Sequence, residues 1–427
     1  MKKNTTLLPY GKGVIELRKT ENMTIFEGKG GRPLRNPSQT LKKMLDEPIG
    51  TVPLAELARK KKAKNAVIVV SDSTRAVPNK EIVPPIIAAL ENAGIFSEQI
   101  LILVGTGTHR PTTHEEKNEL FGSEISRKYK IIDHDCCDEK NLVRFENKEC
   151  DFYVNRRYME SDLKIVTGLI EPHFLAGFSG GRKGVCPGIA GMKTIRYFHS
   201  PAVLESPFAR PGNLKQNPCH IFATSFAETV GVDFIVNVTI NKKKQITGIF
   251  CGDMKMAFEA GVERCRTENV AYASREFDIV ITTNGGYPLD RDFYQTVKGL
   301  VGTLEILKDG GSIICASECS DGLGGPNFRK LLSEMADFDS FMEMISKPNF
   351  FHPDQWEVEA LIWVLRKAKV KLYSCLPDAD SCLARVEPIQ DIETGVKESI
   401  GQYGEKVCIG VIPDSPYTIV ERVCPAA

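Results

Sequence analysis

The segment Glu171 to Ser200 gathers the side chains best suited to covalent, metal and proton chemistry. Its sequence is EPHFLAGFSGGRKGVCPGIAGMKTIRYFHS, with His173 and His199 near its two ends. Between them lies the glycine-rich loop GFSGGRKG, which carries Arg182 and Lys183. Glycine lets the backbone approach a ligand closely, and successive backbone N–H groups in such a loop can bind an anion such as phosphate. The segment therefore indicates a site rather than a core element.

Other polar clusters follow short apolar runs that are typical of buried strands. The runs are AVIVV, ILILV and KII, and the clusters that follow them are Asp72, Thr74 and Arg75 in SDSTR, His109 and Arg110 in GTGTHRP, and His134 with Asp135. In open α/β sheets, ligands bind outside the carboxyl ends of the strands. We therefore expect these clusters to converge with His173 on one edge of a sheet.

Each of these features also has a purely structural interpretation. Ser, Asp and Thr in SDSTR favour turns and helix caps, and Gly-Thr-Gly before His109 can be a tight turn. The GGRKG loop could be a plain mobile loop, and His199 could simply complement a helix C-terminus. We assign His114, His134, His220 and His352 to the structural class. No single motif decides the function. The order of the motifs along the chain is therefore the stronger evidence.

Composition restricts the class of partner. The chain has 427 residues, 55 Lys+Arg and 55 Asp+Glu, so no net field favours nucleic acid or an anionic membrane. The first twenty residues lack a signal-peptide core, and no window approaches a membrane span, which predicts a cytoplasmic protein without a membrane partner. The thirteen cysteines are scattered without a CxxC pair, so we expect reduced thiols. A small molecule is the expected ligand.

The pattern of elements predicts an α/β fold with two lobes. Val- and Ile-rich runs alternate with helical patterns, including a helix over 79–92 with Asn79 as its N-cap and a Thr113/Glu116 capping box. Residues 233–252 predict a hairpin, so each sheet should be mixed or mainly parallel and flanked by helices. A boundary after a helix over 253–269 gives an N-terminal cofactor-binding catalytic domain, 1–269, and a C-terminal α/β domain, 270–427. The latter should contain a helix over about 293–308 and contribute substrate contacts, with the active site in the cleft between the lobes.

Five motifs in one order resemble the nickel-pincer lactate racemase family. They are SDSTR, GTGTHRP, EPHFLAGFSGGRKG, the histidine of RYFHS, and YQTVK at 294–298, and they span roughly residues 65–300. The resemblance implies a racemase or epimerase of a 2-hydroxy acid such as lactate. It also implies a nickel-containing pyridinium mononucleotide, the nickel-pincer nucleotide, and the enzymes that synthesise it as partners.

The resemblance assigns roles residue by residue. It implies that Lys183 is the covalent anchor of the cofactor, that His199 is the nickel ligand, and that His109 and His173 are the acid/base pair. The remaining assignments are cofactor contacts for Asp72, Arg75, Gly180, Gly181 and Arg182, and substrate contacts for Arg75, Tyr294, Gln295 and Lys298.

The chemistry of the residues agrees with these assignments. The α-hydrogen of a 2-hydroxy acid is poorly acidic, and its removal as hydride, while a base takes the hydroxyl proton, avoids a carbanion. Two enantiomers present their hydroxyls in different directions, which calls for two histidines. Arg75 and Lys298 supply positive charge for a substrate carboxylate. Phe174, Leu175 and Phe178 flank His173 and favour an apolar wall, although the identity of the 2-hydroxy acid stays open.

Two other functions remain possible on the residues alone. One is a divalent-metal hydrolase in which His109, His173 and His199 bind zinc, but the chain lacks an HExxH motif and this reading gives Lys183 no role. The other is a non-catalytic two-lobe protein that binds a carboxylate or a nucleotide. Against it stand two histidines suited to acid/base work.

Overall fold

The computed structural model describes residues 4–347, 350–404 and 406–423. The chain forms two compact units: residues 30–268, called the central unit below, and residues 1–29 with 269–427, called the terminal unit. The expected division placed residues 1–29 with the first domain. The structure places them in the terminal unit instead, because β3 (Met23–Ile25) pairs in parallel with β19 (Ile409–Ile412). Leu8 and Leu17 also lie in the core of that unit.

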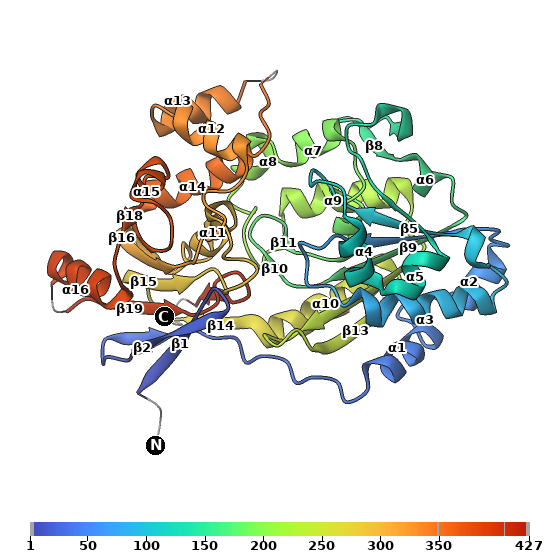
Figure 1. The fold of residues 1–427 in the computed structure, drawn as a ribbon, viewed down its shortest axis with the longest axis horizontal. Helices are drawn as coiled ribbons and strands as arrows, with labels where there is room; N and C mark the ends of the chain where they lie inside the picture. The colour runs from blue at the N-terminus through green and yellow to red at the C-terminus, as the bar shows by residue number, and fades with distance from the viewer. Residues whose placement is uncertain (1–3, 348–349, 405, 424–427) are drawn as a thin grey trace. The chain divides into compact units, whose positions relative to one another are not determined.

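The central unit is built on a six-stranded mixed sheet of order β13-β12-β9-β4-β5-β6 (Figure 1). Every neighbouring pair is parallel except β12 and β13, which form the predicted hairpin. The strands are β4 Ala66–Ser71, β5 Ile100–Gly105, β6 Lys130–Asp133, β9 Leu163–Leu169, β12 Phe234–Ile240 and β13 Ile246–Gly252. Shorter strands are β7 Leu142–Phe145, β8 Phe152–Asn155, β10 Pro172–His173 and β11 Gly177–Phe178.

Helices of the central unit connect and cover these strands. They are α1 Pro37–Asp46, α2 Leu54–Lys60, α3 Asn79–Asn92, α4 His114–Phe121, α5 Ser123–Lys128, α6 Arg156–Met159, α7 Met192–Phe198, α8 Pro201–Leu204, α9 Pro218–Val230 and α10 Met254–Asn269. Short 3-10 turns are η1 Ser97–Gln99, η2 Glu139–Asn141 and η3 Gly181–Gly184. The capping box before α4 is confirmed by the reciprocal bonds of Thr113 and Glu116. The predicted Asn79 cap is wrong, because Pro78 occupies the cap position and the Asn79 amide donates to Ser71 O.

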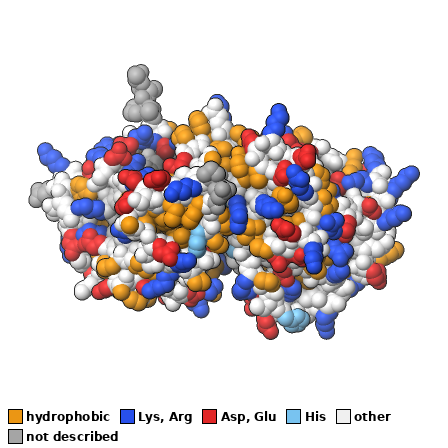
Figure 2. Space-filling view, turned by 90° about the horizontal axis from the view of Figure 1, so that it is seen from above, with side chains coloured by type: hydrophobic (Ala, Val, Ile, Leu, Met, Phe, Trp, Pro, Cys, Tyr) orange, Lys and Arg blue, Asp and Glu red, His pale blue; other side chains and the backbone are white. Residues whose placement is uncertain are grey.

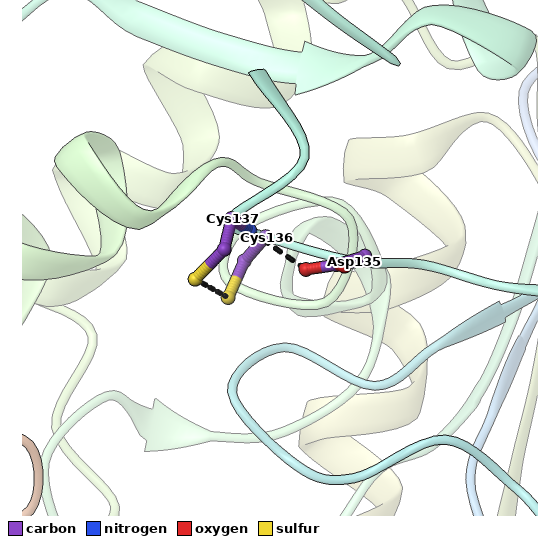
Figure 3. A group of neighbouring side chains, drawn as sticks. All are labelled: Asp135, Cys136 and Cys137. Atoms are coloured by element: carbon purple, nitrogen blue, oxygen red, sulfur yellow. Dashed lines mark hydrogen bonds between the residues drawn. The ribbon is translucent and has the colours of Figure 1, made fainter. Parts of the chain in front are cut away.

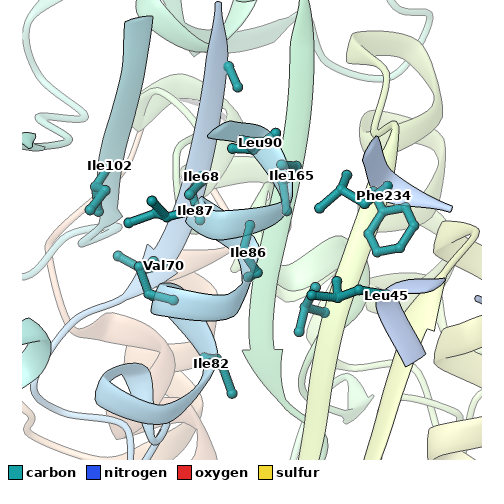
Figure 4. Packing of buried hydrophobic residues seen from close by; sticks show 14 of the residues in the cluster. Leu45, Ile68, Val70, Ile82, Ile86, Ile87, Leu90, Ile102, Ile165 and Phe234 are labelled. Carbon is teal, nitrogen blue, oxygen red and sulfur yellow. The ribbon is translucent and has the colours of Figure 1, made fainter. Parts of the chain in front are cut away.

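Different elements pack on the two faces of this sheet. Side chains alternate across a strand, so Ile68 of β4 and Ile165 of β9 share one face with the apolar residues of α1 and α3, as the cluster in Figure 4 shows. The following residue of β9, Val166, points to the opposite face. There a Cβ on Gly184 would lie 2.5 Å from its Cγ1. The glycine-rich loop therefore packs directly on the sheet.

The terminal unit contains a six-stranded parallel sheet of order β18-β17-β16-β15-β19-β3. Its other strands are β15 Phe277–Thr283, β16 Leu307–Ala316, β17 Ala368–Tyr373 and β18 Glu387–Pro388, with the pairs β1 Thr5–Tyr10 and β2 Gly13–Arg18, and β14 Val270–Ala273 and β20 Ile419–Arg422. The helices are α11 Phe293–Val301, α12 Pro326–Glu334, α13 Phe338–Ile345, α14 Gln355–Lys367, α15 Asp378–Leu383 and α16 Ile392–Tyr403. The expected helix over 293–308 is too long. It ends at Val301 because the chain turns through 302–306 to enter β16.

The surface matches the balanced composition. On the face seen in Figure 2, basic and acidic side chains are interspersed. Within the described ranges, we find no helix with the length and apolar character needed to cross a membrane.

Candidate functional site

The central unit brings the predicted residues together through the loops that follow β4, β5 and β9. The SDSTR and GTGTHRP segments follow the neighbouring strands β4 and β5, and the histidine and lysine of the long segment follow β9. Gly107 N donates to Gly188 O over 3.0 Å, which ties the loop of His109 to the turn after Lys183. The expected convergence at the carboxyl ends of these strands is therefore found.

Asp72 fixes the ring of His109. Its Oδ2 lies 2.6 Å from His109 Nδ1, while its Oδ1 accepts from the Thr74 hydroxyl at 2.6 Å and the Thr74 N–H at 3.2 Å. The SDSTR segment thus forms the expected turn, and its Asp72 carboxylate also contacts His109. Burial raises the pKa of the Asp72 carboxyl, but the hydrogen bond and charge of His109, with Thr74 and Arg75, outweigh it and lower the pKa overall. A carboxylate only accepts, so Nδ1 of His109 carries the proton and Nε2 carries the lone pair.

Backbone groups fix the ring of His173. Its Nδ1 accepts from the N–H groups of Leu175 at 3.2 Å and Ala176 at 3.1 Å. Its ring stacks on Phe174 with a centroid separation of 5.2 Å. Because a backbone N–H only donates, Nδ1 holds the lone pair, and the proton of the neutral ring is on Nε2. His173 therefore has the opposite tautomer to His109.

Lys183 lies next to His173. The distance from Lys183 Nζ to His173 Nε2 is 3.0 Å, and Nζ lies 5.4 Å from the centroid of the Phe198 ring. Burial, followed by the charges of Arg75 and Arg182, lowers the pKa of Lys183 to about 7. A large fraction of this amine is therefore uncharged at neutral pH.

The loop around Lys183 is held by its glycines and by one buried amide. Gly180 and Gly181 have φ of +82° and +51°, a conformation that L side chains rarely adopt. Gly181 N donates to Asn237 Oδ1 at 2.6 Å, and Asn237 Nδ2 has no hydrogen-bond partner among the described residues. Sequence reasoning missed Asn237. The signal was a polar residue inside the buried run FIVNVTI of β12.

Arg182 points into the protein. It is 2% exposed, donates to Ala176 O at 3.0 Å and Gly180 O at 3.3 Å, and lies over the Phe258 ring at 4.3 Å. These contacts indicate that Arg182 shapes the loop and contributes charge to its surroundings. Contact with a bound cofactor stays a prediction for this residue.

His199 follows the last residue of α7. Its Nδ1 lies 3.2 Å from Ile195 O, so Nδ1–H donates to that carbonyl and Nε2 is the acceptor nitrogen. Its ring packs edge-on to Phe198, the ring that Lys183 also approaches. The C-terminal capping expected of His199 and a ligand role are compatible, because the cap uses Nδ1 and leaves the lone pair on Nε2.

Arg75 lies near Glu171, with 3.9 Å between Nη1 and Oε1. Sequence reasoning missed Glu171 as a partner, although it begins the segment that was singled out. Of the expected apolar wall, Leu175 and Phe178 are 1% and 0% exposed and belong to the core. Phe174 is the partly exposed member of the three.

The substrate residues expected from the second lobe lie on α11 of the terminal unit. Lys298 Nζ donates to Gln295 Oε1 at 2.5 Å and lies 5.9 Å from the ring of Tyr294. The hydroxyl of Tyr294 accepts from Trp356 Nε1 at 3.1 Å. Asp292 caps the helix by accepting from Gln295 N at 2.7 Å. These contacts orient Tyr294, Gln295 and Lys298 in the N-terminal half of α11.

A separate group of metal donors lies after β6. In the part of the chain that the structure describes, Asp135, Cys136 and Cys137 are the one group of three His, Cys, Asp or Glu donors that lie within 4.8 Å of one another (Figure 3). The two Sγ atoms are 3.9 Å apart, and such thiols suit a soft cation. His109, His173 and His199 do not form a group of this kind in that part of the chain. The three-histidine hydrolase site is therefore not assembled there.

Two of the remaining histidines have structural environments. His134 is buried between Ala190 O, 2.9 Å from Nε2, and the Asn155 amide, 3.0 Å from Nδ1, and burial lowers its pKa. Burial, then the charge of Arg182, lowers the pKa of His220 to about 4. Both belong to the scaffold of the site.

The fold and the site define a two-unit α/β protein with a loop lysine in contact with one oriented histidine, and a second oriented histidine on a neighbouring loop. Residues 10–212 match the lactate racemase N-terminal domain family, and residues 272–420 match the lactate racemase C-terminal domain family. The chain belongs to the lactate racemase family.

Similar proteins match this chain over almost its whole length. A lactate racemase of Lactiplantibacillus plantarum is 38% identical over 388 residues, covering 90% of this chain and 91% of that protein. One of Thermoanaerobacterium thermosaccharolyticum is 36% identical, covering 97% and 99%. The lactate racemase apoprotein structure from the latter organism superposes with a TM-score of 0.91 at 32% identity, covering 97% and 99%. A Thermotoga maritima protein has the same fold, with a TM-score of 0.69 at 20% identity, covering 92% and 100%.

Proposed function

We propose that this chain racemises or epimerises a lactate-like 2-hydroxy acid, using a nickel-pincer nucleotide attached to Lys183. The observation that carries the proposal is the pair of opposite histidine tautomers, one of them in contact with a largely uncharged lysine. His109 presents a lone pair at Nε2, and His173 presents a proton at Nε2. A racemase of this kind needs one group that takes a hydroxyl proton and one that returns a proton. The names of the relatives support lactate as the substrate.

The residues fit the proposed cofactor. An acyl or thioacyl link requires a neutral amine, and the lowered pKa of Lys183 supplies it. The Nδ1–H bond of His199 to Ile195 O directs Nε2 as a nickel ligand, and imidazole suits nickel. The glycine-rich loop and the amide of Asn237 suit its phosphate group. When bound, the cofactor would supply a reversible hydride acceptor for the substrate α-carbon.

The chain's own residues handle the protons and the substrate carboxylate. His109 accepts the hydroxyl proton at Nε2, and the Asp72 carboxylate stabilises the imidazolium that results. His173 hydrogen-bonds the oxygen of the opposite enantiomer through its Nε2–H, and it gives that proton up only from the imidazolium form. Arg75 binds the carboxylate, and Lys298 with Tyr294 and Gln295 binds the substrate from α11. Enzymes that synthesise the cofactor are the partners, and the cytoplasm is the expected compartment, as its reducing conditions suit the free thiols.

The test is intact-mass measurement on chain expressed with the cofactor-making enzymes. We expect a covalent mass increment and nickel in the wild type, and neither increment nor racemisation in Lys183→Ala. His199→Ala should keep the increment and lose nickel in elemental analysis. With substrate deuterated at Cα, the product should retain deuterium. An unmodified wild-type chain that binds zinc and hydrolyses esters would contradict the proposal.

A further inference from the structure

The bond between His173 and Lys183 fixes the protonation state of the lysine before any cofactor is attached. Leu175 N–H and Ala176 N–H both donate to Nδ1 of His173, at 3.2 and 3.1 Å. The proton of the neutral ring is therefore on Nε2, and Nε2 must be the donor in its 3.0 Å contact with Lys183 Nζ. An ammonium group has three donors and no lone pair, so only the free amine can accept this bond.

The surroundings of Lys183 agree with a free amine. The ionisable groups that act on it are Arg75 and Arg182, whose positive charges oppose its protonation, and the thiols of Cys186 and Cys219, whose weaker effect has the opposite sign. His173 completes the set through its hydrogen bond. Lys164 provides a contrast in the same unit. Burial lowers the pKa of Lys164 as well, but its Nζ donates to Val230 O at 2.9 Å and so keeps the role of a donor.

We propose that His173 is a positioning residue for the covalent loading of Lys183, and that the unmodified chain attacks an activated acyl or thioacyl donor by itself. This inference deepens the proposed function and rests on its assignment of Lys183 as the attachment site. The hydrogen bond from His173 Nε2 opens, the Nζ lone pair that accepted it forms a bond to the acyl carbon, and the bond from that carbon to its leaving group breaks. The leaving group takes the electron pair, and one Nζ proton departs with it through water. No oxidant or reductant is consumed.

Attachment also changes what His173 can do. The nitrogen of an amide or thioamide has a delocalised lone pair and does not accept a hydrogen bond, so the bond from His173 Nε2 is lost on loading. The same N–H is then available to the substrate oxygen. One N–H thus serves first to hold the nucleophile and, after loading, to contact the substrate oxygen.

The test measures the reactivity of each lysine in the cofactor-free full-length chain. A limiting amount of acetic anhydride is added across the pH range from about 5.5 to 9.5, and peptide mass mapping follows the acetylation of Lys183 and Lys164. We expect Lys183 to reach its half-maximal rate near pH 7, as its pKa of about 7 requires, while an ordinary lysine does so near pH 10. A Lys183 that reacts only above about pH 9 would overturn the inference.

Two variants separate the hydrogen bond from the packing of the ring. His173→Phe keeps an aromatic ring against Phe174 but has no donor, and His173→Gln keeps a donor at the position of Nε2. Loss of a hydrogen bond to the neutral amine should cut the Lys183 rate at pH 7 by about fivefold in His173→Phe. His173→Gln should stay within about twofold of the wild type, and Lys164 should not change in either variant. Equal Lys183 rates in the wild type and His173→Phe would overturn the role of His173.

A direct readout of the tautomer does not depend on reactivity. In chain labelled with ¹⁵N histidine, the resonances that disappear in His173→Gln should show a protonated Nε2 and an unprotonated Nδ1. Those of His109 should show the reverse. A proton on Nδ1 of His173 would overturn the inference.

The outcomes separate this inference from the proposed function. If Lys183 is acetylated at neutral pH through His173 but the chain never racemises a 2-hydroxy acid, the inference stands and the proposed function is wrong. If the chain is a racemase but its Lys183 is acetylated only at alkaline pH, the proposed function stands and the inference is wrong.

Discussion

The two histidines of the site differ in what holds their rings. His109 is anchored by a side chain, Asp72, in the turn after β4, whereas His173 is anchored by two backbone N–H groups of its own loop. The side chain of His109 is 46% exposed, while Asp72 behind it is 8% exposed. A carboxylate and a pair of N–H groups are electrostatic opposites. They therefore place the ring proton on opposite nitrogens and give chemically identical residues different resting roles.

In the proposed acid/base pair, one histidine therefore depends on a side chain that can be substituted and the other on its own backbone. The tautomer of His109 can be changed by substituting Asp72, since a long-range contact supplies it. The tautomer of His173 follows from the local path of the backbone through Leu175 and Ala176, which a single side-chain change there would leave in place. Substitutions of neighbouring residues should therefore affect His109 and His173 unequally.

The largest effects should come from removing the rings themselves. In cofactor-loaded chain, His109→Phe and His173→Phe should each lower kcat by about 10²- to 10⁴-fold, the usual contribution of a general acid or base. Racemisation measured from each enantiomer by chiral chromatography, with mass spectrometry to normalise for loading, checks this. Full activity of either loaded variant would break the assignment of a two-histidine pair.

Asp72→Asn should have a smaller effect that is specific to the His109 side. The neutral amide no longer stabilises an imidazolium at His109, so we expect kcat to fall by roughly 10²-fold with little change in KM. The matched control is Thr74→Val, which removes a hydroxyl that contacts Asp72 and leaves the carboxylate beside His109. If Asn at 72 altered KM alone, Asp72 would act on substrate binding instead of on the ring.

The smallest effect concerns the thermal stability of the unmodified chain, to which Lys183 beside His173 contributes. The pKa of Lys183 is about 7 in the folded chain and 10.5 in its ordinary state. Between these values the unfolded chain binds more protons, so this group makes stability rise with pH across that window. Unmodified Lys183→Met should therefore melt about 2–4 °C higher than the wild type near pH 7, with the gap shrinking towards pH 10. Thermal unfolding at several pH values checks this, and a gap that widens with pH would contradict the burial argument.

Sequence patterns correctly predicted elements that depend on short-range interactions. The hairpin of β12 and β13 and the capping box of Thr113 and Glu116 were confirmed, because turn chemistry and capping act over a few residues. The helix from Phe293 ended earlier than its periodicity suggested. The first 29 residues joined the other unit, because strand pairing over nearly four hundred residues leaves no local signal.

The sequence by itself determined which residue types stand at the ends of the strands, the order of the motifs and hence the family. Only the tertiary structure decided how those residues are paired. Asp72 reaches His109 across two loops, and Asn237 reaches Gly181 from the middle of a strand. Lys183 meets His173 because the loop folds back on β9. A tautomer or a lowered pKa depends on partners a few ångströms away in space, and the spacing of residues along a chain does not record that distance.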